Sequence, residues 1–348
     1  MHPRNPYKEP PDFLELAQAY PELKPFVYIS KKGNPSINFK DADGLRLLTL
    51  SLLHRDFGLD LELPTDRLCP AIPNRLNYIL WIQDILANSS RPDETVRGID
   101  IGTGASVIYP LLACKLSPSW VFVATDIDTR SLMVAESNVA RNGLQNRIIV
   151  KQSLPDGPII SDVLLDPSFP AYDFVMCNPP FYGSREEVDQ ATEDKEFDPS
   201  AACTGADFEM ITPGGEGVFV TRIVNESVDV GKRCRWFTSL LGKHTSVAAV
   251  VAAIKGLKID NYGITEFIQG NTRRWGVVWS FSDERLPDNL IRPSSDSLHS
   301  LQPPSNQLRQ PILYGGSCDV FLPIDQMNFG CGLATIHGRA KLDGFWKG

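Results

Sequence analysis

The sequence predicts an α/β protein built around one doubly wound sheet, and three observations indicate this fold. Short apolar segments typical of strands alternate with helical segments between about residues 97 and 281. A glycine turn, Gly102-Thr103-Gly104, joins the first of these strands to the helix after it. The 348 residues, of which 42% are apolar and 22% charged, are enough for one sizeable core or two modest ones.

An N-terminal arm and two helices are expected before the sheet. Residues 1–40 are rich in proline and lysine, with aromatic residues between them, and we expect an extended arm that wraps the body. Leucines recur at helical spacing over residues 41–57, where Asp41 can cap the start of a helix and Gly58 can end it. A second helix is expected over about residues 73–88.

The following segments give seven strands and the helices that connect them. The strands are expected over residues 97–101, 120–125, 148–150, 174–177, 236–241, 266–269 and 275–281. The helices are expected over residues 105–116, 129–142, 217–230 and 246–255. Residues 286–311 are dominated by proline, serine, asparagine and glutamine, which is typical of a linker or disordered tail.

The net charge of −8 is unusual for a protein that binds nucleic acid, so the local distribution of charge matters more than the total. Residues 184–209 carry nine acidic side chains against only Arg185 and Lys195. Basic residues gather in the stretch 232–244, and Arg273-Arg274 follows later. A solvated surface explains such a basic run as well as a nucleic-acid contact does.

Cysteine and histidine usage argues against a metal site. The seven cysteines are scattered with no CxxC pair, and the five histidines show no ligand spacing. Reduced thiols are typical of an intracellular compartment. No apolar run approaches the ~20 residues of a membrane span, and residues 1–6 lack the apolar segment of a secretory signal.

The glycine turn and the acid that follows it predict a nucleoside site. The segment 100–106, DIGTGAS, lies between a strand and a helix, where glycines let the backbone approach a ligand closely. Asp126 ends the next strand, where a carboxylate can accept hydrogen bonds from both ribose hydroxyls. The full G-x-G-x-x-G spacing is absent, which disfavours a dinucleotide.

Asn178-Pro179-Pro180-Phe181, called the NPPF loop below, directly follows the fourth strand. Two prolines make this loop rigid, at the edge of the sheet where ligands of α/β proteins bind. The Asn178 side-chain carbonyl and the Pro179 backbone carbonyl are two acceptors suited to an NH₂ group, and Phe181 offers a flat face to the ring that carries it. The loop therefore predicts a site for a planar amine.

This combination of a GxG turn with an Asn-Pro-Pro-aromatic loop resembles the Rossmann-like class I methyltransferases that modify amino groups of adenine, cytosine or glutamine. Further segments, in order, resemble the adenine-N6 RNA methyltransferases: residues 2–5, 38–41, 73–79, 100–106, 178–181, 214–216, 226–227, 236 and 269–275. Eukaryotic members of this family modify U6 small nuclear RNA, and bacterial members modify ribosomal RNA. DIGTGAS and NFKD (residues 38–41) are more similar to the eukaryotic branch.

The resemblance implies S-adenosylmethionine as the methyl donor and an unpaired adenine as the acceptor, and it favours U6 RNA as the substrate. Residues expected at the donor site are Arg75, Asp100, Gly102, Gly104, Ser106, Asp126 and Asn178. Asn178, Pro179, Pro180 and Phe181 are expected to hold the target adenine for direct transfer. Residues expected to hold RNA are Arg4, Lys8, Lys40 and Arg274. The acidic segment 184–209 and Asn271 stand where the family often carries basic residues.

We expect three parts in the chain: an arm and helical RNA-binding extension (1–90), a methyltransferase domain with an acidic insert at 183–208 (91–284), and a linker or disordered tail (285–348). We expect a monomer in the nucleus or cytoplasm, with no metal and no membrane association. Three alternatives stay open: a ribosomal RNA adenine methyltransferase, a methyltransferase of glutamine amides in proteins, and an inactive RNA-binding scaffold.

Overall fold

The structure is a computed structural model that describes residues 1–88, 95–166, 171–196, 205–269, 272–293 and 295–305. Contacts divide the chain into two units, Met1–Pro304 and Ser305–Gly348. The first unit contains every predicted site residue.

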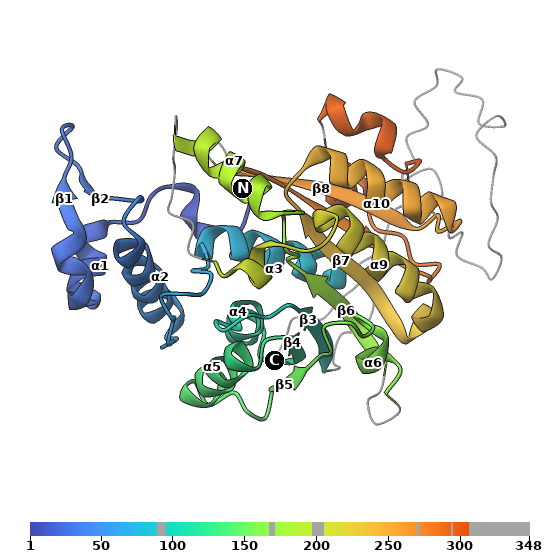
Figure 1. Ribbon diagram of the computed structural model, residues 1–348, viewed down its shortest axis with the longest axis horizontal. Helices are drawn as coiled ribbons and strands as arrows, with labels where there is room; N and C mark the ends of the chain where they lie inside the picture. The colour runs from blue at the N-terminus through green and yellow to red at the C-terminus, as the bar shows by residue number, and fades with distance from the viewer. Residues whose placement is uncertain (89–94, 167–170, 197–204, 270–271, 294, 306–348) are drawn as a thin grey trace, which may run out of the picture. The chain divides into compact units, whose positions relative to one another are not determined.

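One sheet of seven strands forms the centre of this unit, in the order β5-β4-β3-β6-β7-β9-β8 (Figure 1). The first five strands in this order run parallel, and β9 runs antiparallel to both of its neighbours. The strand bounds are β3 Val96–Ile101, β4 Trp120–Asp126, β5 Ile148–Gln152, β6 Tyr172–Cys177, β7 Cys234–Leu241, β8 Tyr262–Gln269 and β9 Thr272–Trp279. The seven predicted strands are confirmed, with ends that differ by a few residues.

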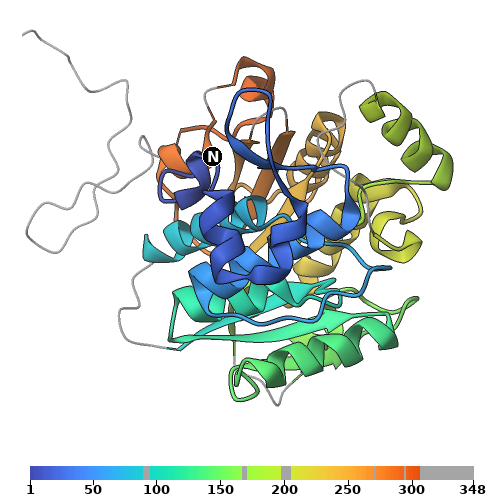
Figure 2. The ribbon, with the colours of Figure 1, turned by 90° about the vertical axis from the view of Figure 1, so that its left-hand side faces the viewer.

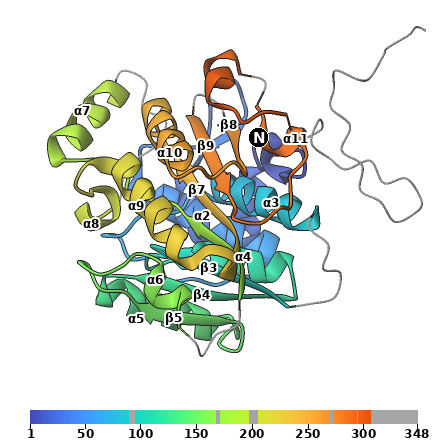
Figure 3. The same cartoon turned by 90° about the vertical axis from the view of Figure 1, so that its right-hand side faces the viewer.

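Helices cover both faces of the sheet, as a doubly wound fold requires. Each face has its own apolar core, and consecutive strand residues such as Phe174 and Val175 point into opposite cores. Figure 3 shows α9 and α10 on one side of the sheet and α3 on the other. The helices packed on it are α3 Ile72–Ala87, α4 Ile108–Leu116, α5 Thr129–Arg141, α6 Ser161–Leu164, α9 Gly215–Val230 and α10 His244–Gly256.

Capping explains where the early helices begin and end. The Asp41 carboxylate accepts a hydrogen bond from the Gly44 N–H (2.9 Å) at the start of α2, Ala42–Phe57, and Gly58 ends that helix with φ +57°. Both signals were predicted. In contrast, α4 begins three residues later than expected, because Val107 takes a left-handed conformation (φ 43°) and the turn continues to that residue.

The N-terminal arm is folded, which corrects the expectation of an extended segment. It contains η1 Pro6–Lys8, α1 Phe13–Ala19, η2 Pro21–Phe26 and a hairpin of β1 Val27–Ile29 with β2 Pro35–Ile37. This arm faces the viewer in Figure 2. Asp12 caps α1 by accepting hydrogen bonds from Leu14 and Glu15. Pro6 and Pro21 lie in first helical turns, where proline is tolerated, so proline content alone was misleading.

Residues 285–293 and 295–304 are also folded, although they were expected to belong to the linker. They form α11 Asp288–Ile291 and η4 Asp296–Leu301. Leu286, Ile291 and Leu298 are buried, and the Trp81 indole donates a hydrogen bond to the Leu290 carbonyl (3.0 Å). The domain therefore continues about twenty residues beyond the expected boundary at 284. Residues 306–348, where the tail was also predicted, lie outside the described residues.

The acidic insert contains α7 Arg185–Glu196 and, at its end, α8 Asp207–Met210, while residues 197–204 lie outside the described part. Within the described residues, no helix is long and apolar enough to cross a membrane. The described residues also contain no group of three or more histidine, cysteine or acidic side chains arranged to hold a metal ion.

Candidate active site

A cavity of about 570 Å³ opens at the carboxyl edge of the parallel strands, a size typical of small-molecule sites. It lies between the turn after β3, the end of β4, the NPPF loop after β6, the start of α3, the short helix α8 and strand β9. Nine predicted site residues line it: Arg75, Gly102, Gly104, Ser106, Asp126, Asn178, Pro180, Phe181 and Arg274. The fold thus brings together segments that are up to 200 residues apart in sequence.

The glycine turn is held against β4 by backbone hydrogen bonds. The N–H groups of Gly102 and Thr103 both donate to the Thr125 carbonyl at 2.9 Å. Gly102 and Gly104 have φ values of +70° and +63°, in the left-handed region that favours glycine. This conformation lets the backbone form one wall of the cavity without a side chain.

Asp126 binds the same turn. Its Oδ2 accepts a hydrogen bond from the Gly104 N–H (2.8 Å), and its Oδ1 accepts one from the Asp128 N–H (3.0 Å). Burial raises the pKa of this carboxyl group, although the backbone donors oppose that shift. Each carboxylate oxygen can accept a second hydrogen bond, so this geometry leaves room for the predicted contact with ribose hydroxyls. That contact stays a prediction.

Several buried polar atoms around the cavity have no hydrogen-bond partner among the described residues. They are both carboxyl oxygens of Asp100, the hydroxyls of Thr103 and Tyr109, and the Asn178 Oδ1. The Thr103 hydroxyl lies near Asp100 and the Arg75 side chain near Tyr109, close enough to oppose the rise of both pKa values but without good hydrogen-bond geometry. Burial raises the pKa of Asp100 to about 7. Asp100 does not itself line the cavity but lies in β3, two residues before the glycine turn. Because unpaired buried polar atoms are costly, these groups fit a ligand that brings its own donors and acceptors.

The NPPF loop is fixed at its start by a buried tyrosine from the N-terminal extension. The Tyr78 hydroxyl in α3 accepts a hydrogen bond from the Cys177 N–H (3.3 Å) and contacts the Thr238 hydroxyl at 2.7 Å. Thr238 in turn donates to the Val175 carbonyl (2.8 Å). The end of β6 is therefore tied to α3 as well as to β7, and Asn178 follows directly from this fixed point. Pro179 does not line the cavity.

Two arginines stack on aromatic rings inside the cavity. The Arg274 guanidinium lies 5.1 Å from the centre of the Phe181 ring, and that of Arg75 lies 5.5 Å from the Tyr109 ring. Burial lowers the pKa of Arg274, and the nearby charge of Arg75 contributes to that shift. Arg274 was expected to help hold RNA, and this role stays a prediction. It lines the cavity and covers one face of the ring expected to stack on the target base.

The other residues predicted to bind RNA lie away from the cavity. Lys8 and Lys40 are exposed. Arg4 is bound to the N-terminal extension itself, through an ion pair with Asp84 (2.5 Å) and a hydrogen bond to Gln83 (2.8 Å). None of the three lines the cavity, so their roles stay predictions.

The sequence analysis did not single out α8, although Phe208, Glu209 and Met210 all line the cavity. The Glu209 Oε2 accepts hydrogen bonds from Leu68 (2.9 Å) and Ala206 (2.8 Å), and so ties this helix to the loop before α3. In the sequence, Glu209 is one of nine acids in residues 184–209, and no feature of the sequence distinguishes this buried acid from the exposed ones.

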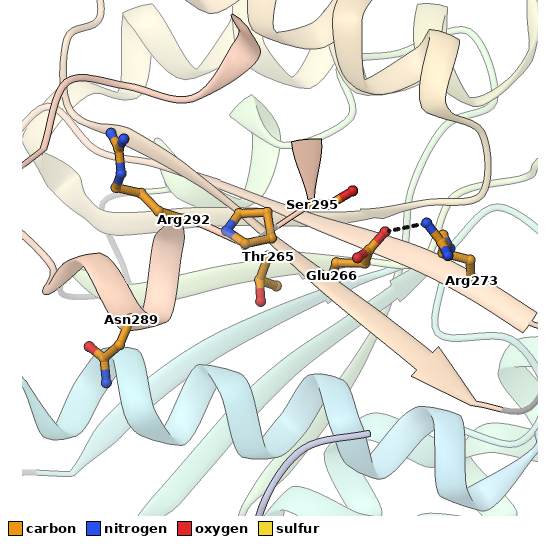
Figure 4. A pocket seen from close by; sticks show the side chains of 7 residues that line it. Thr265, Glu266, Arg273, Asn289, Arg292 and Ser295 are labelled. Carbon is orange, nitrogen blue, oxygen red and sulfur yellow. Dashed lines mark hydrogen bonds and ion pairs between the residues drawn. The ribbon is translucent and has the colours of Figure 1, made fainter. Parts of the chain in front are cut away.

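A second hollow lies beside β8 and α11 and is shown in Figure 4. Arg273 there forms an ion pair with Glu266 (3.2 Å), and Arg292 lies 3.8 Å from Asp288. Both cations have acidic neighbours, and none of the residues predicted for the site lines this hollow.

Comparison with known proteins identifies the family. A family model described as RNA methyltransferase matches residues 1–283, which is most of the chain. This chain belongs to that RNA methyltransferase family. The family and the Rossmann-like fold inferred from the motifs are both confirmed.

Among curated relatives, mouse RNA N(6)-adenosine-methyltransferase METTL16 is 42% identical over 288 residues, which are 82% of this chain and 52% of that protein. The U6 small nuclear RNA (adenine-(43)-N(6))-methyltransferase of Schizosaccharomyces pombe is 41% identical over 272 residues, 78% of this chain and 69% of that protein. The chain therefore spans about half the length of the METTL16 relatives that it matches.

Solved structures of the same family superpose closely. The hMettl16 catalytic domain in complex with the MAT2A 3'UTR hairpin 1 gives a TM-score of 0.76 at 39% identity, over 85% of this chain and 99% of that one. The N-terminal domain of human METTL16 in complex with SAH gives 0.69 at 40% identity, over 81% and 99%.

Proposed function

We propose that this chain transfers a methyl group from S-adenosylmethionine to the exocyclic amine of an unpaired adenine in RNA. The observation that carries the proposal is the buried Asn178 Oδ1, which has no partner among the described residues and lies in one cavity with Phe181, the glycine turn and Asp126. The proposed nucleoside site and the proposed site for a planar amine would thus share one cavity. Family membership supports the same activity.

The residues around the glycine turn fit the methyl donor. Asp126 would accept hydrogen bonds from the ribose hydroxyls, and the backbone of Gly102 and Gly104 leaves room for the nucleoside. Asp100 does not line the cavity, but its buried carboxylate lies two residues before the glycine turn and would favour the cationic donor through its charge. When bound, S-adenosylmethionine supplies an activated methyl group on a positively charged sulfur. The SAH complex of human METTL16 is consistent with this donor.

The NPPF loop would hold the acceptor amine. One of its N–H groups would donate to the Asn178 Oδ1, which lines the cavity. The other would donate to the Pro179 carbonyl if the base reaches past the present lining, which does not include Pro179. Together these bonds would favour a more pyramidal and more nucleophilic nitrogen. Phe181 would stack on the base, a contact worth ~1–3 kcal/mol. Holding the amine in line with the methyl group supplies much of the remaining barrier reduction, since orientation can contribute ~7–11 kcal/mol. The adenine must be unpaired or flipped out to reach the loop.

U6 small nuclear RNA is the substrate we propose, and the nucleus the compartment. The Schizosaccharomyces pombe relative is named for this reaction, and the segments DIGTGAS and NFKD support the eukaryotic branch. Arg4, Lys8 and Lys40 would contribute to RNA binding from the N-terminal extension, and Arg274 from the cavity.

Mass spectrometry of RNA nucleosides tests this function. The protein is incubated with total RNA and labelled donor, and we expect label in N6-methyladenosine but not in methylcytidine. Labelled U6 RNA supports the assigned substrate, whereas labelled ribosomal RNA alone favours the bacterial type of reaction. Methylated glutamine in protein without RNA label refutes the RNA assignment. Donor binding without any product indicates an inactive scaffold.

A further inference from the structure

Gly242 lies against the ring of Phe181. A Cβ atom at this position would lie 2.9 Å from the Phe181 Cδ1 and 3.3 Å from its Cε1, closer than side chains normally allow. Gly242 is not among the glycines with positive φ, so its backbone conformation is open to other residues. The need for glycine here is therefore one of space, because the missing side chain makes room for the edge of the Phe181 ring.

Glu216 holds the turn that contains Gly242. It lies in the first turn of α9, and its side chain is buried. Its Oε2 accepts a hydrogen bond from the Gly242 N–H (2.6 Å), and its Oε1 accepts one from the Lys243 N–H (2.8 Å). A buried carboxylate with both oxygens bonded to consecutive N–H groups fixes the position of that backbone. A Cβ on Gly242 would also lie 3.3 Å from the Glu216 Oε2.

The same turn contacts the residues immediately after the NPPF loop. The Lys243 ammonium forms an ion pair with Glu187 and lies 5.4 Å from the centre of the Tyr182 ring. Glu187 in turn accepts a hydrogen bond from the Gly183 N–H (2.6 Å). The turn at Gly242 and Lys243 therefore contacts the loop at Phe181 and fixes the two residues that follow it.

These contacts leave Phe181 little freedom. Gly242 meets one edge of its ring, and the Arg274 guanidinium covers a face at 5.1 Å. We propose that Gly242 and Glu216 are positioning residues, which set the Phe181 ring for the target base before RNA binds. The inference rests on the proposed function, in which Phe181 stacks on adenine. Neither residue lines the cavity, so both act through Phe181 and not by touching the donor.

Single-turnover methylation at saturating RNA and donor tests the proposal. Gly242→Ala displaces the ring, and we expect the rate to fall about tenfold, since misplacement by an ångström can cost more than this. Glu216→Gln leaves one of the two N–H groups without its acceptor, and we expect a smaller loss. Donor affinity, measured by calorimetry, should be unchanged in both variants. Gly256→Ala is the matched control, because nothing lies within 4 Å of a Cβ there.

A double-mutant cycle decides whether the effect passes through Phe181. In a Phe181→Ala background, Gly242→Ala should cause no further loss of rate. Full additivity, a wild-type rate in the Gly242→Ala single variant, or reduced donor affinity would overturn the proposal. If Gly242→Ala lowers the melting temperature severely, Glu216→Gln takes its place in the cycle.

A readout in the absence of RNA separates this inference from the proposed function. Fluorine NMR of 4-fluorophenylalanine at position 181 reports the surroundings of the ring in the free protein. We expect Gly242→Ala and Glu216→Gln to change its signal, and Gly256→Ala to leave it unchanged. Wild-type protein that methylates no RNA refutes the proposed function, while an unchanged fluorine signal in both variants refutes the positioning role.

Discussion

Asp100 is deeply buried, and this burial raises the pKa of its carboxyl group to about 7. Neither carboxyl oxygen accepts a hydrogen bond of good geometry among the described residues. Such a group takes up a proton as the pH falls through neutrality. A cationic ligand in the nearby cavity favours the carboxylate, so binding of the donor and protonation of Asp100 oppose each other.

The competition predicts that donor affinity falls as the pH drops below 7. For a single group with a pKa of about 7, the fraction ionised falls about eightfold from pH 7.5 to pH 6, and affinity should follow it. Calorimetry of donor binding at several pH values measures this, and proton uptake or release appears as a dependence on the buffer used. Asp100→Asn should flatten the profile. An equally steep profile in that variant would assign the titration to another group.

Asn178 tests the chemistry more directly. Asn178→Ala removes an acceptor aimed at the amine, an interaction that strengthens as the nitrogen attacks, and we expect the rate to fall ~10²-fold. The rigid prolines and the Tyr78 contact at Cys177 set the path of the loop, so the fold should be retained. RNA affinity should change little. Phe181→Ala should instead impair placement of the adenine. If Asn178→Ala keeps more than half of the wild-type rate, a different acceptor must hold the amine.

At the scale of elements, the acidic insert is the unusual feature. In α7, Glu187 is bound to Lys243 and Gly183, and Asp189 forms an ion pair with Arg185 (3.1 Å). Residues 190–204 carry four further acids against the single cation Lys195. Because acids repel phosphate, we predict that this part of the insert gates RNA entry and does not bind RNA.

Replacing residues 190–204 with a short glycine-serine linker should therefore raise RNA affinity or leave it unchanged, measured at fixed salt. A variant of full length with its acids in this segment changed to amides is the control that separates charge from bulk. Clear loss of RNA binding in the shortened protein would show that the insert grips RNA.

The elements differ in how far the sequence could predict them. The seven strands and the helices α3, α4, α5, α9 and α10 have apolar patterns, and all of these were predicted. The short elements α1, α6, α8 and α11 were missed, because four to seven residues give too little periodicity and tertiary packing holds them in place. Helix α7 was missed because its sequence is dominated by acidic residues. The site divides in the same way. The NPPF loop and the glycine turn have sequence signatures. Glu216 lies in the segment 214–216 that resembles the family, but nothing in the sequence indicates its hydrogen bond with Gly242, 26 residues later, or the contact of Gly242 with Phe181.

At the scale of the whole molecule, residues 285–305 connect the two apolar cores. Leu286 and Ile291 belong to the core that contains α3, and Leu298 belongs to the core that contains α9 and α10. Ile291 packs where Gly263 has no side chain, since a Cβ on that glycine would lie 2.3 Å from the Ile291 Cβ. The Tyr262 hydroxyl donates a hydrogen bond to the Leu301 carbonyl (3.1 Å). The segment is thus part of the fold.

We therefore predict that a chain ended after residue 284 is less stable than one ended after residue 305. Each fully buried aliphatic side chain contributes about 1.5–3 kcal/mol, so removing three of them should lower the free energy of unfolding by about 4 kcal/mol or more. Urea denaturation of the two truncated proteins measures the difference. Ile291→Ala in the longer chain is the companion variant, with an expected loss of about 2 kcal/mol or more. Equal stability of the two truncated chains would mean that this segment only covers the surface, and the domain boundary would return to 284.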